Sequence, residues 1–425
     1  MLYYGADHAM KTAVPGARRA LVLLIALNLL SYIDRYILAA VEPEIRKTFF
    51  SANDPDALAK TGLLATAFLL SYLVTAPIFG WLADRFSRWV LIAIGAAVWS
   101  FASMGSGLAQ TFGLLLFMRV FVGVGEAAYG PAAPTILSDL FPAEKRGLIF
   151  AWFLAAIPVG SALGYMFGGA TAAAFGWRWP FHLAAIPGVI LAIICLFFKD
   201  NRPTCATERP RATWADYRAL FRIRSYRFNV AAQTAMTFAI GGMSFWAPAY
   251  FSGQRGQADL AQVNLIFGGI TAVAGLASTL FGGWLGDRLV QRIPGAYFLV
   301  SAGGMLLAFP FTLAMLFAPF PLAWVFCFLA VFFLFFNIGP ANTALANVTK
   351  PSVRATAFAV NIFVIHALGD AISPPLIGAI GDRWNLTAGF IVVSLTMLLA
   401  GLFWLWGTRY LPSDEARVRA EESVA

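Results

Sequence analysis

Charged residues are scarce in this chain of 425 residues. Asp, Glu, Lys and Arg together make up 12% of it, whereas hydrophobic residues make up 60%. Soluble globular domains carry about 25% charged residues. The low charged fraction therefore excludes an ordinary water-soluble protein, because too few polar side chains are available to cover a water-facing surface.

Cysteine and histidine are also rare, with three of each. Cys195 and Cys327 lie in apolar runs, a pattern that favours neither a disulfide framework nor a thiolate metal site. The histidines are far apart in the sequence, and no glycine-rich phosphate-binding loop is present. We therefore expect no enzyme, no cofactor or metal, and no transport driven by ATP.

Long apolar runs occupy most of the chain. A membrane-spanning helix needs about 20 predominantly apolar residues. The apolar residues in these runs are continuous, which is typical of spanning helices, whereas the strands of a membrane barrel alternate apolar and polar residues. The runs predict an all-α membrane protein with twelve transmembrane helices in two pseudo-symmetric six-helix bundles. The predicted spans are residues 20–43, 61–83, 88–110, 112–140, 147–172, 178–198, 227–252, 261–286, 294–318, 321–346, 355–380 and 386–409.

The positive charges are unevenly distributed between the loops. If both termini are cytoplasmic, 22 of the 30 Lys and Arg residues fall on cytoplasmic segments and six on outer segments. The positive-inside rule favours this orientation, which predicts an integral protein of a bacterial inner membrane. The net charge of +9 then reflects the cytoplasmic loops, and no nucleic-acid partner is expected.

A polar, arginine-rich linker, residues 201–226, divides the chain into two bundles, residues 1–200 and 227–425. In this linker, Thr213 and Asp216 resemble a helix-capping box, and apolar residues then recur at helical spacing beside Arg218. We expect a short amphipathic helix here, with its basic face against anionic lipid headgroups. A regulatory role is the alternative.

Two short motifs recur at a spacing of about 200 residues. Residues 80–85 read Gly-Trp-Leu-Ala-Asp-Arg, and residues 283–288 read Gly-Trp-Leu-Gly-Asp-Arg. A Gly-Pro pair at residues 130–131 recurs at residues 339–340. One duplicated six-helix unit explains both repeats, and many secondary transporters that work by alternating access are built in this way.

The repeated motif resembles that of the major facilitator superfamily, and the resemblance extends over essentially the whole chain. In that superfamily the motif helps to hold the outward-facing state, so the resemblance implies a cytoplasmic gate; a simple topology anchor is the alternative. Glycine permits close helix approach, and Asp beside Arg can form a breakable charge pair. A stripe of small residues from Pro158 to Gly169 resembles the superfamily's fifth-helix motif and suits packing against the other half. The predicted gate residues are Gly80, Asp84, Arg85, Arg88, Asp287 and Arg288.

A narrower resemblance is to the spinster subfamily, in particular to a bacterial spinster homologue. It rests on residues 28–35 (Asn-Leu-Leu-Ser-Tyr-Ile-Asp-Arg), 119–126 (Arg-Val-Phe-Val-Gly-Val-Gly-Glu), 139–141 and 158–164. Eukaryotic spinster proteins export lysophospholipids or phosphorylated sphingoid bases. The resemblance therefore implies a secondary active transporter of an amphipathic lysolipid- or sphingolipid-like substrate. An organic-anion/proton symporter, a drug/proton antiporter of the same superfamily and a non-concentrative lipid scramblase are the alternatives.

The few ionisable residues at membrane depth, where charges are costly, mark candidate functional sites, and four of them lie on two predicted helices of the first half. Asp34 and Glu126 are each about 14 residues, roughly 21 Å, from the cytoplasmic face. Arg35 follows Asp34 directly, and Arg119 lies about two turns from Glu126 on the same helix face. We expect a cluster in which Glu126, together with Asp34, exchanges protons while the two arginines hold an anionic headgroup. A buried network that merely fixes two helices is the alternative.

The second half of the chain offers one further candidate for substrate binding. Asp370 follows His366 by one helical turn in a predicted span, although a simple polar contact would explain the same spacing. Many phenylalanines in this half would suit the tail of an amphipathic substrate or simply pack against lipid. The expected partners are such a substrate, protons and membrane lipids, and we expect a monomer.

Overall fold

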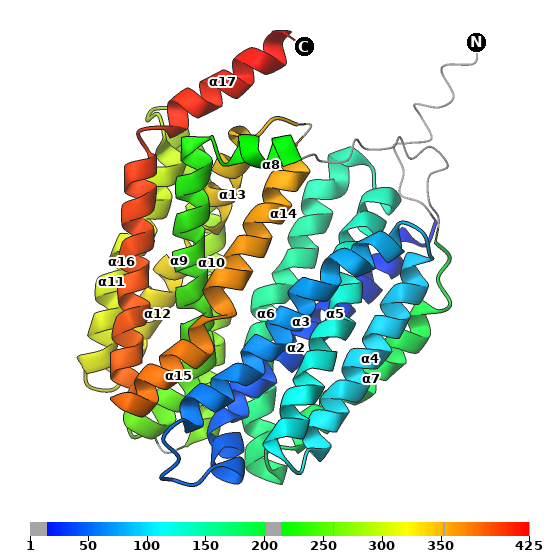
Figure 1. Ribbon diagram of the computed structural model, residues 1–425, viewed down its shortest axis with the longest axis vertical. Coiled ribbons are helices and arrows are strands. Elements are labelled where there is room, and N and C mark those ends of the chain that lie inside the picture. The colour runs from blue at the N-terminus through cyan, green and yellow to red at the C-terminus, as the bar shows by residue number, and fades with distance from the viewer. Residues whose placement is uncertain (1–14, 201–213, 258, 352, 425) are drawn as a thin grey trace. The chain divides into compact units, whose positions relative to one another are not determined.

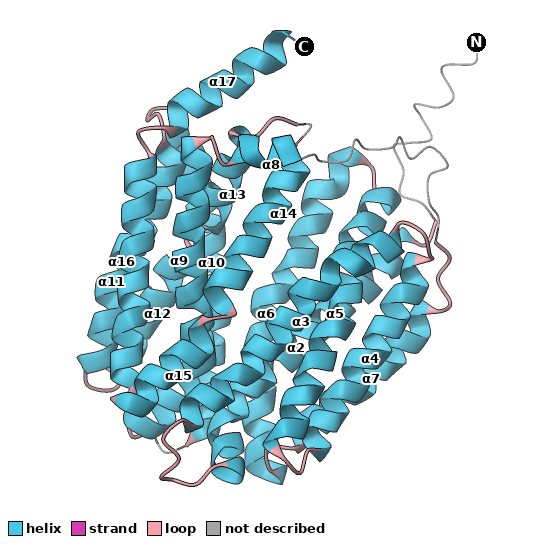
Figure 2. Ribbon diagram, viewed as in Figure 1, coloured by secondary structure: helices cyan, strands magenta, loops and turns pink. Residues whose placement is uncertain are grey.

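The computed structural model describes residues 15–200, 214–257, 259–351 and 353–424. Within these ranges the chain forms helices joined by short loops (Figures 1 and 2). The elements in order are α2 (Ala17–Phe49), α3 (Ala57–Ala83), α4 (Arg88–Leu108), α5 (Phe112–Leu140), α6 (Ala143–Phe175), α7 (Trp179–Cys195), α8 (Trp214–Leu220), α9 (Arg224–Ala249), η1 (Tyr250–Gln254), α10 (Leu260–Val290), α11 (Ala296–Phe317), α12 (Leu322–Phe335), α13 (Ile338–Asn347), α14 (Arg354–Ile365), η2 (His366–Asp370), α15 (Ser373–Arg383), α16 (Leu386–Gly407) and α17 (Leu411–Val424).

The predicted membrane spans correspond to these helices. Of the described residues, ten segments are long and apolar enough to cross a membrane. Two more predicted spans coincide with α7, an apolar helix of 17 residues, and with α9, a helix of 26 residues. The prediction of an all-α membrane protein is thereby confirmed. The short helix α8 lies in the segment for which an amphipathic helix is expected, while Thr213 of the predicted capping box lies outside the described residues.

The chain forms two compact units. Unit 1 consists of Met1–Phe50, Ala67–Glu208 and Asp259–Gly268, and unit 2 consists of Ser51–Thr66, Arg209–Ala258 and Gly269–Ala425. Helix α3 therefore begins in unit 2 and ends in unit 1, whereas α10 begins in unit 1 and ends in unit 2. The sequence, which suggests a single division at the linker, does not reveal this exchange of helix ends.

In unit 1, the stripe of small residues on α6 packs against α2. A Cβ atom added to Gly160 would lie 2.7 Å from Cβ of Tyr32, and one added to Gly164 would lie 2.7 Å from the carbonyl oxygen of Ile33. Farther along the stripe, Gly169 meets Asn264 of α10 in the same way. The expectation that this stripe packs against the other half holds only where α6 meets the start of α10, since a Cβ atom on Gly268 would lie 2.8 Å from the carbonyl oxygen of Ala162. At Gly160 and Gly164 it is wrong, because the helix that approaches there is α2 of the first half.

In unit 2, two consecutive prolines interrupt the helix that begins with α14. Proline has no backbone N–H, so Pro375 cannot donate to the carbonyl of Ala371 four residues earlier. The hydroxyl of Thr66 in α3 donates to that carbonyl instead, at 2.6 Å. In addition, the indole N–H of Trp246 in α9 donates to the carbonyl of Pro374 at 2.9 Å. The break between η2 and α15 is thus stabilised by side chains from two neighbouring helices.

The first turn of α3 is capped by a residue that is distant in the sequence. The two carboxylate oxygens of Asp382 accept hydrogen bonds from the backbone N–H groups of Leu58, at 3.0 Å, and Ala59, at 2.8 Å. Glycine allows this approach, because a Cβ atom on Gly378 would lie 2.5 Å from the carbonyl oxygen of Leu58. Asp382 of α15 therefore takes the place of an N-cap residue at the end of α3 that belongs to unit 2.

Replacing Asp382 with alanine is expected to loosen the first turn of α3. Loss of an N-cap costs about 0.5–2 kcal/mol, so amide exchange in residues 57–62 should become roughly tenfold faster. Asp382→Asn keeps one acceptor oxygen and should fall between alanine and wild type. Hydrogen–deuterium exchange followed by mass spectrometry measures this effect, and unchanged exchange in the alanine variant would contradict the capping role.

Candidate functional site

The four charges predicted at membrane depth lie at the centres of two helices of unit 1. Asp34 and Arg35 are within two residues of the midpoint of α2, Ala17–Phe49. Glu126 is the midpoint of α5, Phe112–Leu140, and Arg119 lies two turns before it. Thr111 fixes where α5 begins, because its hydroxyl oxygen accepts a hydrogen bond from the backbone N–H of Leu114 at 3.2 Å and caps the helix.

Each acid of this cluster pairs with the arginine of the other helix. Nη2 of Arg35 donates to Oε2 of Glu126 at 2.7 Å. Nη1 of Arg119 lies 3.5 Å from Oδ2 of Asp34, which is a looser ion pair. The sequence places Asp34 beside Arg35 and Arg119 beside Glu126, but the structure joins neither of these pairs. The crossed arrangement ties α2 to α5 through two ion pairs.

Two residues that the sequence analysis did not single out complete the cluster. Ser103 of α4 donates its hydroxyl to Oδ1 of Asp34. Phe68 of α3 lies under both guanidinium groups, with its ring centroid 4.6 Å from Cζ of Arg35 and 5.5 Å from Cζ of Arg119. An aromatic face between two like charges favours both of them. The recurrence of serine at positions 100, 103 and 106 is the only signal in the sequence that could have indicated a polar face on α4.

The cluster is buried but not fully satisfied. Asp34 and Glu126 are each 2% exposed and Arg119 is 1% exposed, whereas the side chain of Arg35 is 27% exposed. Oε1 of Glu126 and Nε of Arg119 have no hydrogen-bond partner among the described residues, and Oδ2 of Asp34 and Nη1 of Arg119 meet only each other, in the 3.5 Å ion pair. Unpaired polar atoms at this depth are costly. The cluster is therefore a candidate functional site.

Asp370, the further candidate for substrate binding, belongs to unit 2. Nδ1 of His366 lies 3.0 Å from each carboxylate oxygen of Asp370, and both residues are in η2. The side chains are 32% and 23% exposed. The structure therefore gives Asp370 a partner on its own helical turn, and its role in substrate binding stays a prediction.

The first copy of the gate motif contains one firmly held residue, Arg88. Its guanidinium donates to Asp139 and to Asp200, each at 2.6 Å, and to the hydroxyl of Thr135 at 3.2 Å. The backbone N–H of Arg88 also donates to Asp200 at 2.8 Å. Arg88 is 6% exposed. It joins the start of α4, the end of α5 and the segment after α7, all within unit 1.

Asp84 and Arg85 of the first copy are exposed, and Gly80 is half-buried. Arg85 stacks on Trp81 of its own helix, with Cζ 4.0 Å from the ring centroid, and donates to the carbonyl of Trp81 at 3.1 Å. Asp84 is exposed beside it. A Cβ atom on Gly80 would have Pro131 as its nearest described neighbour, at 4.0 Å. Gly80 therefore does not serve close helix approach in this structure.

The second copy of the motif lies at the end of α10 in unit 2. The hydroxyl of Tyr297 donates to Asp287 at 3.1 Å. Arg288 is exposed, with Cζ 5.8 Å from the ring centroid of Trp284. Both copies thus place an arginine against the tryptophan four residues earlier. Their part in gating stays a prediction.

Metal binding has no candidate within the part of the chain that the structure describes. No group of three or more His, Cys, Asp or Glu side chains there could hold a metal ion. The described carboxylates of the charge cluster are instead paired with arginines.

Comparison with known proteins gives matches over most of the chain. The family model described as Major Facilitator Superfamily matches residues 24–374. Protein spinster homolog 3 of Danio rerio is 34% identical over 430 aligned positions, which cover 93% of this chain and 85% of the relative. Protein spinster homolog 1 of Homo sapiens is 36% identical, over 88% of this chain and 75% of the relative.

A similar fold occurs among solved structures. The crystal structure of a bacterial homologue of the human lysosomal transporter spinster, in an inward-facing and unoccupied conformation, superposes with a TM-score of 0.77. The sequence identity is 19%, and the match covers 95% of this chain and 98% of the other. The similarity in sequence and the similarity in fold both extend over nearly the whole chain.

Proposed function

Since the chain belongs to the major facilitator superfamily and, within it, to the spinster family of membrane transporters, we propose that it couples protons to the movement of an amphipathic, anionic lysolipid- or sphingolipid-like substrate. It works by alternating access, in which the binding residues are exposed to one side of the membrane at a time. The buried charge cluster of Asp34, Arg35, Arg119 and Glu126 carries this proposal.

Proton coupling follows from the chemistry of the paired groups. An arginine stays charged at every physiological pH, whereas a carboxylate can take up a proton. Protonation of Glu126 would break its ion pair with Arg35 and release the guanidinium. Oε1 of Glu126 supports this role because Arg35 binds only Oε2 and leaves the other buried oxygen to take up a proton. A proton on Glu126 thus frees Arg35 to bind the anionic group of the substrate.

The substrate class follows from the same arginine and from the family. A guanidinium group binds phosphate through two parallel hydrogen bonds. The side chain of Arg35 is 27% exposed, whereas Arg119 is 1% exposed, so Arg35 is the group that a phosphate headgroup would reach first. Lysophospholipids and phosphorylated sphingoid bases, which the spinster resemblance implies, both carry such a headgroup.

We place the protein in a bacterial inner membrane as a monomer, with both termini in the cytoplasm. This orientation is supported by the excess of Lys and Arg on the loops that it makes cytoplasmic. The gate motif at Gly80, Asp84, Arg85 and Arg88, with Asp287 and Arg288 in the second copy, then lies on the cytoplasmic side. There its exposed members, Asp84, Arg85, Asp287 and Arg288, would separate and rejoin as the transporter changes state, while the buried Arg88 holds unit 1 together.

Transport into proteoliposomes under an imposed pH gradient tests this function. Separate samples contain a fluorescent lysophospholipid, a sphingoid-base phosphate, a hydrophilic organic anion or a lipophilic cation. Concentrative uptake of either of the first two, abolished by a protonophore, is the expected result. Concentrative uptake of only the organic anion or only the cation would replace the lipid substrate with that class. Equilibration of the lipids without accumulation would instead identify a scramblase.

A further inference from the structure

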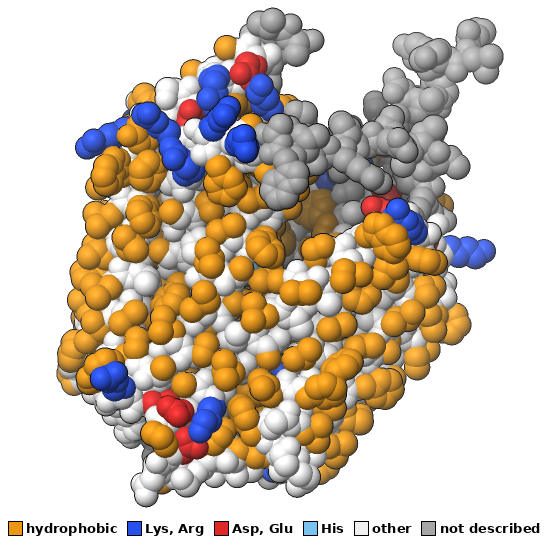
Figure 3. Space-filling model, viewed as in Figure 1, with side chains coloured by type: hydrophobic (Ala, Val, Ile, Leu, Met, Phe, Trp, Pro, Cys, Tyr) orange, Lys and Arg blue, Asp and Glu red, His pale blue; other side chains and the backbone are white. Residues whose placement is uncertain are grey.

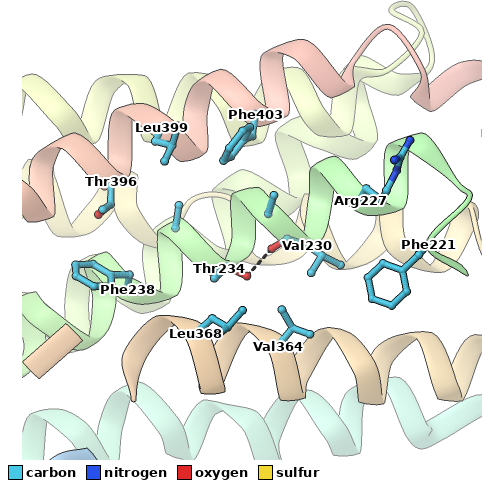
Figure 4. Close-up of a pocket in the computed structure, with 12 residues that line it drawn as sticks. Phe221, Arg227, Val230, Thr234, Phe238, Val364, Leu368, Thr396, Leu399 and Phe403 are labelled. Carbon is cyan, nitrogen blue, oxygen red and sulfur yellow. Dashed lines mark hydrogen bonds between the residues drawn. The ribbon is translucent and has the colours of Figure 1, made fainter. Parts of the chain in front are cut away.

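A cavity on unit 2 is lined by side chains from three neighbouring helical segments. It has a volume of about 460 Å³ and lies between α9, the stretch from α14 into η2, and α16. In Figure 4, Leu399 and Phe403 of α16 and Val364 and Leu368 of the α14–η2 stretch point toward α9. None of the lining residues belongs to the charge cluster. We call this cavity the α9 groove.

The wall of the α9 groove offers an occupant an apolar surface, although it contains two threonines. Its two threonines keep their hydroxyl groups bonded to their own helices, Thr234 to the carbonyl of Val230 at 2.8 Å and Thr396 to that of Val393 at 2.8 Å. They therefore offer no free donor to an occupant. Leu368, at 57% exposed, and Leu399, at 44%, leave the groove open along its side. Such a wall excludes a sugar or another polar solute and suits a hydrocarbon chain.

One end of the α9 groove carries a positive charge. Arg227 lines that end, beside Phe221, and it is exposed. Among the residues that the structure describes, no carboxylate forms an ion pair with Arg227. Figure 3 shows Lys and Arg side chains gathered over unit 2 at the end where α8 and α17 lie, with apolar side chains across the middle of its helices. An occupant of this groove is therefore apolar along its length and negative at the Arg227 end.

The length of the α9 groove matches one leaflet of a bilayer. From Arg227 to Phe238 the groove follows eleven residues of α9, which is about 16 Å at 1.5 Å per residue. The hydrocarbon core of a bilayer is about 30 Å thick, so each leaflet contributes roughly half of that. A chain bound with its headgroup at Arg227 would end near Phe238, close to the middle of the membrane.

We propose that the α9 groove is a binding site for a phospholipid of the surrounding bilayer with an anionic headgroup. The phosphate group lies at Arg227 and an acyl chain follows α9 as far as Phe238. Charge is what distinguishes this site from ordinary lipid contact, because a basic residue near the membrane surface attracts anionic lipid. The site is separate from the proposed transport function and does not depend on proton coupling.

Native mass spectrometry of the detergent-purified chain, titrated with phosphatidylglycerol or phosphatidylcholine, tests this site. Wild type should retain phosphatidylglycerol in preference to phosphatidylcholine. Arg227→Gln should reduce that preference about fivefold, which corresponds to about 1 kcal/mol, and Arg227→Lys should restore it. Arg222→Gln removes an exposed charge outside the groove and is the matched control, with an expected effect near zero.

A second pair of variants tests the apolar part of the site. Ala235→Phe fills the α9 groove and should reduce retention of both lipids, whereas Leu402→Phe, on α16 outside the groove, should not. Equal losses in Arg227→Gln and Arg222→Gln would overturn the proposal, because the basic surface as a whole would then bind the lipid. Full retention in Ala235→Phe would overturn it too. Thermal unfolding of each variant shows whether it is folded. Restoration of the lipid preference in Arg227→Lys shows that the loss in Arg227→Gln is due to the missing charge and not to misfolding.

Discussion

Replacing Glu126 with glutamine is expected to abolish proton-driven accumulation of the substrate. A gradient of one pH unit, worth about 1.4 kcal/mol per proton, can sustain roughly a tenfold accumulation. Glutamine has nearly the shape of glutamate and can still accept a hydrogen bond from Arg35, but it cannot release a proton. The accumulation ratio in proteoliposomes should therefore fall from about ten to about one, while exchange of labelled for unlabelled substrate continues and loses its dependence on pH.

Glu42 offers a matched control for this experiment. Like Glu126 of α5, Glu42 of α2 is a buried acid, at 0% exposed, and it pairs with an arginine, Arg46, at 3.1 Å. It lies two turns from Asp34 and outside the charge cluster. Glu42→Gln should therefore leave accumulation unchanged. If Glu126→Gln still concentrates the substrate within twofold of wild type, Glu126 is not the coupling acid.

The choice of Glu126 over Asp34 rests on the exposure of their partners. Glu126 pairs with Arg35, whose side chain is 27% exposed, while Asp34 pairs with Arg119, which is 1% exposed. Asp34 also accepts a hydrogen bond from Ser103. A proton and a headgroup can therefore reach the Glu126 pair more readily, and Asp34 is better suited to hold the second arginine in place.

The sequence was sufficient to predict the membrane spans, because continuous apolar runs determine where helices cross a bilayer. It did not show where those helices break. Pro374 and Pro375 indicate an interruption, but its stabilisation depends on Thr66 and Trp246, which come from helices distant in the sequence. The cap on α3 has the same origin, since Asp382 follows it by more than 300 residues.

The depth of the charge cluster could also be predicted from the sequence, because position along a helix fixes depth. The pairing within it could not, because that depends on how α2 and α5 are rotated toward each other. Arg35 faces Glu126 and Arg119 faces Asp34 only when both helices are in place. Ser103 was missed although serine recurs at positions 100, 103 and 106, and Phe68 was missed because a single phenylalanine in an apolar helix carries no signal of its own.

The gate motif shows the limit of arguing from a motif alone. The sequence treats Arg85 and Arg88 as equivalent members of one charged loop. In the structure Arg85 is exposed and donates to a carbonyl of its own helix, whereas Arg88 is buried and binds two carboxylates from other segments of unit 1. The difference arises because Asp139 and Asp200, which are far from the motif in the sequence, converge on Arg88.

Replacing Arg88 with glutamine is therefore expected to destabilise unit 1 by about 3 kcal/mol. Breaking a buried ion pair by removing one partner costs about 3–5 kcal/mol, and the lower value applies because the side chain of Asp139 is 25% exposed. The variant removes the cation that Asp139 and Asp200 share. It therefore also breaks the link that Arg88 makes between the start of α4, the end of α5 and the segment after α7. The free energy of unfolding in mixed micelles, measured by denaturant titration, should fall by this amount.

Arg85→Gln is the control, because it removes a charge of the same motif three residues away. Its side chain is exposed, and a substitution of this kind changes stability by less than about 0.5 kcal/mol. A gating role makes the opposite prediction for Arg88, namely a changed transport rate at unchanged stability. If Arg88→Gln and Arg85→Gln unfold alike while only Arg88→Gln alters the rate of substrate exchange, then Arg88 acts as a gate and its two carboxylate contacts do not stabilise unit 1.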